Sequence, residues 1–234
     1  MGHDHQDTWK HAAGVEAVKF IEEGMVLGIG SGTTAAQMIY ALAQRIHNGL
    51  RIRGAVPTSQ ATAELAVKLG IPLTDLDTYP ELDLAIDGAD EIDGQLRLIK
   101  GGGGALLREK IVASSAQRFV VIADVTKQVA QLGSTAPLPV EVIPFAATPV
   151  RRRLEALGAS VQMRQAANRA FRTDNGNVIL DCFFAQGIAD PEELESGIRR
   201  IVGVVESGLF LHMAELAIIS GPEGIKLLPL VLPD

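Results

Sequence analysis

Residues 87–110 read DGADEIDGQLRLIKGGGGALLREK. Acidic side chains, a lysine and four consecutive glycines stand between an apolar segment, residues 82–86, and a segment with helical periodicity, residues 105–116. Neither a core segment nor an ordinary surface loop has this composition. Because a short apolar run is typical of a buried strand, the stretch predicts a strand, a loop with chemical functions at the strand end, and a helix.

The first half of the chain repeats this alternation. The predicted strands are 25–29, 51–56, 82–86, 96–99 and 119–123, and the predicted helices are 8–23, 33–47, 60–69 and 105–116. Strands separated by helices form a mainly parallel sheet with helices on both faces. The predicted fold class is therefore α/β.

The pattern changes near Pro137, where residues 137–145 (PLPVEVIPF) carry prolines inside a strand-like run. Such prolines predict an edge strand or a crossover between domains. A helix at 148–157, a hairpin of strands 161–164 and 178–183 around the Asn175-Gly176 turn, and a helix at 191–201 then follow.

This order predicts a second, smaller α+β domain over residues 137–207. Strands at 216–220 and 226–232 are expected to return to the first sheet. The first domain then comprises residues 1–136 and 208–234.

The composition limits the function. The chain has 234 residues, a net charge of −7 and 47% hydrophobic residues. The acidic balance argues against a nucleic-acid partner but allows a small anionic substrate, because local donors can hold an anion. A single cysteine, Cys182, fits a reducing compartment.

No secretory or membrane segment is expected, since no apolar run reaches about 18–20 residues. Near the N-terminus, His3 and His5 flank Asp4 and form a conceivable metal site, although a solvated terminus is the stronger expectation.

The motif GIGSGTTAA, residues 28–36, predicts a phosphate-binding turn. Glycines let the backbone approach an anion, and the start of the following helix offers free N–H groups. The alternative is a tight strand-to-helix turn with an N-cap, and the motif alone leaves both open. A dinucleotide site is disfavoured because the second strand ends without an acid, and a P-loop because Thr33, not lysine, follows Gly32.

Two further motifs lie in the opening stretch. Asp87 and Asp90 follow a predicted strand, where ligands bind in open α/β sheets; an ordinary Asp-Gly turn with a solvated Asp90 or Glu91 is the alternative. Asp93 and Gly94 are expected to form a hairpin turn. Lys100 and the glycines after it offer a charge and backbone N–H groups to an oxyanion, with a flexible linker as the alternative.

Glu109 shares the small, apolar face of its predicted helix with Ala105, Val112, Ala113 and Ala116. Partial desolvation would raise the pKa of a carboxylate there and suit it to act as a base. The alternative is a salt bridge with Arg108 or Lys110, which are expected to be solvated.

Together these groups suit proton transfer next to a carbonyl. Aldose–ketose isomerisation needs a base, donors for an enediolate oxygen and an acid that opens the sugar ring, and it needs no metal or cofactor.

In this order and spacing, GIGSGTTAA, DGADEID, IKGGGGALLREK, ADVTKQV, LPVEVIP and TDNGNVILD resemble ribose-5-phosphate isomerase of the A type. The resemblance runs from about Lys10 to about Gly224. It implies interconversion of D-ribose 5-phosphate and D-ribulose 5-phosphate through an enediolate, without metal, in the pentose phosphate pathway. It also implies a Rossmann-like domain with a smaller ferredoxin-like domain, a homodimer or homotetramer, and a cytoplasmic location.

The resemblance also implies roles for residues. Glu109 would be the base, Asp87 would assist ring opening, and Asp90 would bind sugar hydroxyls. Lys100 and the amides of Gly101, Gly102 and Gly103 would stabilise the oxyanion. The further substrate-binding residues would be Ser31, Gly32, Thr33, Thr34, Gly88, Ala89, Lys127 and Lys10.

The departures from the family pattern are small. The turn reads S-G-T-T where some members have T-G-S-T, Gly104 replaces a common alanine, and residues 229–234 (PLVLPD) have no assigned role. A sugar-phosphate sensor and a CoA-transferase relative are the competing hypotheses. The sensor lacks room for a DNA-binding motif, and neither explains Asp87, Lys100 and Glu109 together.

Overall fold

The computed structural model describes residues 2–229, and for residues 2–4 it describes the backbone only. The contacts divide the chain into two compact units. The large unit contains residues 1–89, 108–127 and 213–234, and the small unit contains residues 90–107 and 128–212. The His3 and Asp4 side chains and most of the PLVLPD segment lie outside the described residues.

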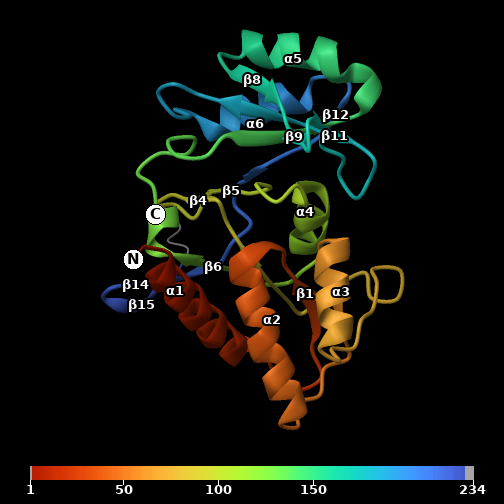
Figure 1. Cartoon of the computed structure of the whole chain (residues 1–234), viewed down its shortest axis with the longest axis vertical. Helices are drawn as coiled ribbons and strands as arrows, with labels where there is room; N and C mark the ends of the chain where they lie inside the picture. Colours follow the sequence, from red (N-terminus) through yellow and green to blue (C-terminus); the bar gives the residue numbers. More distant parts are fainter. Residues whose placement is uncertain (1, 230–234) are drawn as a thin grey trace. The chain divides into compact units, whose positions relative to one another are not determined.

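The large unit is built on a six-stranded sheet in the order β15-β14-β6-β3-β1-β2 (Figure 1). All neighbours are parallel except β14 and β15. The predicted α/β class is confirmed. The strands are β1 (Val26–Ile29), β2 (Gly54–Pro57), β3 (Leu84–Gly88), β6 (Phe119–Asp124), β14 (Leu216–Gly221) and β15 (Gly224–Pro229).

The helices of this unit differ little from the prediction except at the start of the chain. They are α1 (Gly2–Ala17), the 3₁₀ turn η1 (Val18–Phe20), α2 (Gly32–His47), α3 (Gln60–Lys68), α4 (Leu106–Ser114) and the 3₁₀ turn η2 (Val125–Lys127). The first helix begins six residues earlier than expected, since α1 starts at Gly2 rather than residue 8. In the described residues no helix is long and apolar enough to cross a membrane.

Strand alternation separates two faces of the large sheet. Leu27, Leu84 and Ile86 belong to a buried core with residues of α1 and α2. Gly28 and Ala85 point to the opposite face, where the side chain of Val112 from α4 lies. The prediction of helices on both faces is therefore confirmed, and α4 covers the carboxyl ends of the central strands.

The small unit contains a four-stranded antiparallel sheet in the order β12-β7-β11-β8. The chain order is strand, helix, two strands, helix, strand, which is the ferredoxin-like arrangement that was expected (Figure 1). Its elements are β7 (Leu138–Val142), the 3₁₀ turn η3 (Pro144–Ala146), α5 (Ala147–Ala156), β8 (Ser160–Met163), β11 (Val178–Phe183), α6 (Pro191–Arg199) and β12 (Val204–Ser207).

Residues of both helices share one core cluster with one face of this sheet. Val150 and Leu154 of α5 and Ile198 of α6 pack with alternate residues of β7 and β11. The opposite face carries Pro139, Glu141 and Asp181. Neither α5 nor α6 therefore packs on this second face.

The expectation of an edge strand at residues 137–145 is wrong, because β7 pairs with β11 on one side and β12 on the other. Pro137 precedes the strand and Pro144 follows its end, whereas Pro139 lies within the ladder opposite Asp181. The predicted pairing of residues 161–164 with 178–183 is confirmed. Its connection is longer than a simple turn and contains β9 (Gln165–Ala166) and β10 (Arg169–Ala170).

A three-stranded sheet, β13-β5-β4, completes the small unit. Its strands are β4 (Glu91–Ile92), β5 (Leu98–Ile99) and β13 (Leu209–Phe210), and the predicted Asp93-Gly94 hairpin joins β4 to β5. The alternative of a solvated Glu91 is excluded. Its carboxylate is fully buried and accepts hydrogen bonds from the amides of Gly133, Thr135 and Ala136.

The two-domain division stays a prediction, because compact units of one chain need not fold independently. The observed units differ from it in three segments. Residues 90–107, 128–136 and 208–212 belong to the small unit.

Burial of Cys182 gives a test of the small unit's core. Desolvation, followed by the charge of Asp181, raises the pKa of the Cys182 thiol from 9.0 to about 12. Because three pKa units lower the thiolate fraction about 10³-fold, we expect iodoacetamide at pH 8 to label the folded chain about 10³-fold more slowly than the chain in guanidinium chloride. Mass spectrometry follows the labelling. Equal rates in both conditions would contradict the buried position.

Candidate active site

The turn after β1 holds the carboxylate of Asp87. The Ser31 and Gly88 amides donate to Asp87 Oδ1 at 3.0 and 2.7 Å, and the Asp87 side chain is buried. A Cβ at Gly30 would lie 1.9 Å from Asp87 Oδ1, which is closer than any real contact. Glycine at position 30 is therefore what lets the carboxylate occupy the end of the sheet.

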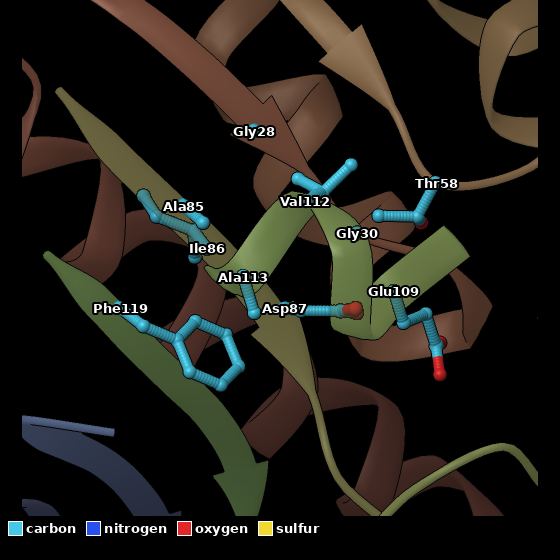
Figure 2. Close-up of a pocket in the computed structure, with 10 residues that line it drawn as sticks. All are labelled: Gly28, Gly30, Thr58, Ala85, Ile86, Asp87, Glu109, Val112, Ala113 and Phe119. Atoms are coloured by element: carbon cyan, nitrogen blue, oxygen red, sulfur yellow. The ribbon is translucent and has the colours of Figure 1, made fainter. Parts of the chain in front are cut away.

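Glu109 lies on the α4 face that covers the same strand ends. Asp87 and Glu109 line one small pocket with Thr58, Ala113 and Phe119 (Figure 2). Glu109 is only 6% exposed. The prediction that Glu109 shares a face with Val112 and Ala113 is confirmed, and the carboxylates of Asp87 and Glu109 line the same pocket.

Close packing brings α4 to this position. A Cβ at Gly28 would lie 2.4 Å from Cγ1 of Val112, so only glycine lets the helix approach β1 this closely. The expectation that Lys110 is solvated is wrong, since its side chain is buried, and Arg108 is half-buried. Both neighbours of Glu109 are therefore packed more tightly than the sequence suggested.

The N-terminus of α2 differs from those of two other helices. Ser59 before α3 and Asp190 before α6 accept a hydrogen bond from the amide three residues on. Ser31, the N-cap of α2, makes no such bond. The first amides of α2, from Gly32, Thr33 and Thr34, thus have no side-chain cap, which is the condition under which a helix start binds an anion.

The Ser31 hydroxyl instead joins a network that sequence analysis missed. It lies 2.7 Å from Thr58 Oγ1, 2.9 Å from Ser59 Oγ and 3.1 Å from Thr62 Oγ1. Thr62 donates to the carbonyl of Gly30, which can only accept, so Ser59 must donate to Thr62 and Ser31 to Ser59. Thr58 is then the donor to Ser31. The direction of hydrogen-bond donation is therefore fixed for all four hydroxyls.

The small unit holds the lysine and glycine motif. Lys100 is 2% exposed, with Nζ 5.4 Å from the centre of the Phe210 ring, and its amide donates to the Gly208 carbonyl at 2.9 Å. The Gly102 amide donates to Asp90 Oδ2 at 2.7 Å. Gly101 has a φ of +99°, which favours glycine. An ordered loop replaces the flexible linker that was the alternative.

The other predicted site residues occupy varied places. In the large unit, Gly88 and Ala89 are half-buried at the end of β3, and Lys127 is half-buried at the end of η2. Lys10 lies on α1 with its Nζ 3.7 Å from Asp7 Oδ1. Among the described residues there is no cluster of three or more histidine, cysteine or carboxylate side chains fit to hold a metal.

Comparison with known proteins gives a family for the chain. The family model for ribose 5-phosphate isomerase A (phosphoriboisomerase A) matches residues 54–224. The chain belongs to the ribose 5-phosphate isomerase A family. The family predicted from the motifs is confirmed, and with it the isomerase class of enzyme.

Relatives in this family match over nearly the whole chain. A ribose-5-phosphate isomerase A from Roseiflexus sp. (strain RS-1) is 56% identical over 222 residues, which are 94% of this chain and 94% of the relative. The isomerase A structure from Methanocaldococcus jannaschii is 42% identical with a TM-score of 0.90, and covers 95% of this chain and 98% of its own.

A D-ribose-5-phosphate isomerase solved with phospho-erythronic acid is 39% identical to this chain, with a TM-score of 0.92. The match covers 96% of this chain and 99% of the solved one. The fold of the isomerase A family is thus shared along the whole chain.

The Gly30–Asp87 approach can be tested by adding one methyl group. We expect Gly30→Ala to lower isomerase activity by about 100-fold or more, because the Cβ displaces the Asp87 carboxylate by about 1 Å. A coupled isomerase assay and a melting curve measure the effect.

Gly94→Ala is the matched control, since a Cβ there meets no atom within 4 Å. A folded Gly30→Ala protein with normal activity would show that the Asp87 position is unimportant.

Proposed function

We propose that this isomerase interconverts D-ribose 5-phosphate and D-ribulose 5-phosphate by proton transfer through an enediolate, in the pentose phosphate pathway. The observation that carries the proposal is the pair of buried carboxylates, Asp87 and Glu109, in one pocket. The pair belongs to the same unit as the uncapped start of α2. Family membership supplies the substrate class.

The phosphate group of the substrate binds at the start of α2. Gly32 and Thr33 are exposed there and Thr34 is half-buried, so an anion can reach their amides. Ser31 contributes by position, because its amide and hydroxyl are engaged by Asp87 and by the hydroxyl network. Lys10 and Lys127 add positive charge for the substrate.

Glu109 acts as the base. It removes the proton from C2 of the open-chain aldose, the electron pair of the broken C–H bond forms the C1–C2 double bond, and the carbonyl π pair moves to O1. The O2 hydroxyl proton then passes to O1, and Glu109 returns its proton to C1, which leaves the carbonyl at C2. Burial suits this carboxylate to the task because water does not compete for the proton. Asp87 handles the proton that moves when the sugar ring opens, and the Gly88 and Ala89 backbone borders the same substrate.

Lys100 and the glycine loop stabilise the negative charge on the enediolate oxygen. The Gly102 amide donates to Asp90 and therefore helps to hold the loop. The amides of Gly101 and Gly103 are the candidates for donating to the oxyanion. Asp90 binds sugar hydroxyls with its remaining acceptor capacity. The related enzyme bound to phospho-erythronic acid supports an oxyanion site in the family, since that ligand pairs a phosphate with a carboxylate.

The remaining proposals concern the assembly and the place of action. We propose a homodimer or homotetramer in the cytoplasm, two domains with the predicted boundaries, and a small sugar phosphate as the partner instead of nucleic acid or membrane.

The proposed base is tested first. With EDTA present, we expect the wild type to form ribulose 5-phosphate from ribose 5-phosphate, and Glu109→Gln to lose about 100-fold or more in kcat. The matched control is Glu64→Gln, which changes an exposed glutamate of the same unit and leaves kcat unchanged.

Two outcomes of this assay would contradict the proposal in different ways. An inactive wild type would refute the isomerase proposal and favour the sugar-phosphate sensor. Full activity in Glu109→Gln would keep the family and transfer the proton step to Asp87.

The phosphate site gives a second prediction. D-ribose without the phosphate should show a kcat/KM about 10³-fold lower than ribose 5-phosphate, since about 4 kcal/mol of charge-assisted hydrogen bonds is lost. Inorganic phosphate should in turn inhibit competitively. Equal use of the two sugars would exclude the start of α2 as the phosphate site.

A further inference from the structure

We infer that Arg164 is a positioning residue that fixes the orientation of the backbone amides of the KGGGG loop, residues 100–104. The inference rests on the proposed function, because it assigns a task to the loop that stabilises the enediolate. Arg164 follows β8 and belongs to none of the predicted site residues.

Arg164 bonds directly to the loop. Its Nη1 donates to the carbonyl oxygen of Gly101 at 2.8 Å and to that of Gly102 at 3.0 Å. The guanidinium thereby holds two consecutive peptide groups within the small unit, and no side chain of the loop is needed for this contact.

The planarity of the peptide bond turns this contact into control of the amides. In a trans peptide the C=O and the following N–H point in opposite directions. Holding the Gly101 carbonyl therefore sets the direction of the Gly102 amide, which donates to Asp90. Holding the Gly102 carbonyl sets the direction of the Gly103 amide, which must point away from Arg164.

Asp181 fixes the guanidinium. Arg164 Nε donates to Asp181 Oδ2 at 2.9 Å, and Nη2 donates to Asp181 Oδ1. Both side chains are 14% exposed. A two-point bond between planar groups holds the guanidinium in one orientation, which lysine cannot reproduce.

Backbone hydrogen bonds also fix Arg164, and one of its partners, Phe171, lies beside the end of the loop. The Arg164 amide donates to Ile179 at 2.9 Å, and its carbonyl accepts from the Phe171 amide at 2.9 Å. The Phe171 ring lies where a Cβ of Gly104 would be, with a ring carbon 2.5 Å from that position. The same part of the small unit therefore holds the middle and the end of the glycine loop.

The four glycines explain why such support is needed. Glycine loses more backbone freedom on ordering than any other residue, so an unsupported run samples many amide directions. Charge-assisted bonds from Arg164 remove this freedom before the substrate arrives. Stabilisation of the transition state then needs no reorganisation of the loop.

The test compares Arg164→Met with Arg172→Met. Arg172 also donates to a glycine carbonyl of the small unit, that of Gly176, but in a different turn. We expect Arg164→Met to lower kcat about 10- to 100-fold, less than full removal of an oxyanion donor, with KM for ribose 5-phosphate changed less than about threefold. Arg172→Met should retain wild-type kcat and KM.

A second measurement separates amide orientation from general stability. Affinity for phospho-erythronic acid, which carries a carboxylate as well as a phosphate, should fall in parallel with kcat in Arg164→Met. Arg164→Lys should restore only part of both, because it keeps the charge but not the planar two-point bond. If Arg164→Met does not fold, Asp181→Asn carries the test, with a smaller loss of kcat and an unchanged KM expected.

Three results would overturn the inference: a folded Arg164→Met protein with wild-type kcat, a loss confined to KM, or a loss that matches only the unfolded fraction seen by circular dichroism. In each of these the wild type remains an active isomerase and the proposed function stands. An inactive wild type would instead refute the proposed function itself.

Discussion

The absence of a side chain at Gly30 is the constraint on which the large unit's site depends. The Asp87 carboxylate fills the space that a Cβ would take and accepts from the Ser31 amide. The Ser31 hydroxyl joins the Thr58 network and does not cap the start of α2. The absence of a Cβ at Gly30 therefore lets the Asp87 carboxylate lie beside the start of α2, which has no side-chain cap.

Close packing and positive φ angles both determine where glycine is needed in the two motifs. In residues 28–36, the Val112 side chain and the Asp87 carboxylate leave no room for a Cβ at Gly28 and Gly30, and Gly32 has a φ of +90°. In residues 100–104, Gly101 and Gly104 have positive φ, and the Phe171 ring leaves no room for a Cβ at Gly104. The second motif differs in that the Arg164 side chain also donates hydrogen bonds to its backbone.

Much of this could be predicted from sequence, because periodicity and motif spacing are local. The alternation of strands and helices, the apolar face of α4 around Glu109 and the hairpin at Asp93 all depend on neighbouring residues. The alternative of a solvated Glu91 stayed open because its partners come from residues 133–136. Thr58 and Arg164 were missed for the same reason, since nothing in their own segments shows which distant backbone they contact.

The strand order of the large sheet has a consequence for synthesis of the chain. β14 begins at Leu216 and pairs with β6, which ends at Asp124, so residues 128–212 of the small unit are translated between the two. Until β14 emerges from the ribosome, the β6 edge presents a row of unpaired backbone groups to other nascent chains. The β6 sequence FVVIAD is almost wholly apolar, and chaperone binding to the unfinished chain is expected to centre on it.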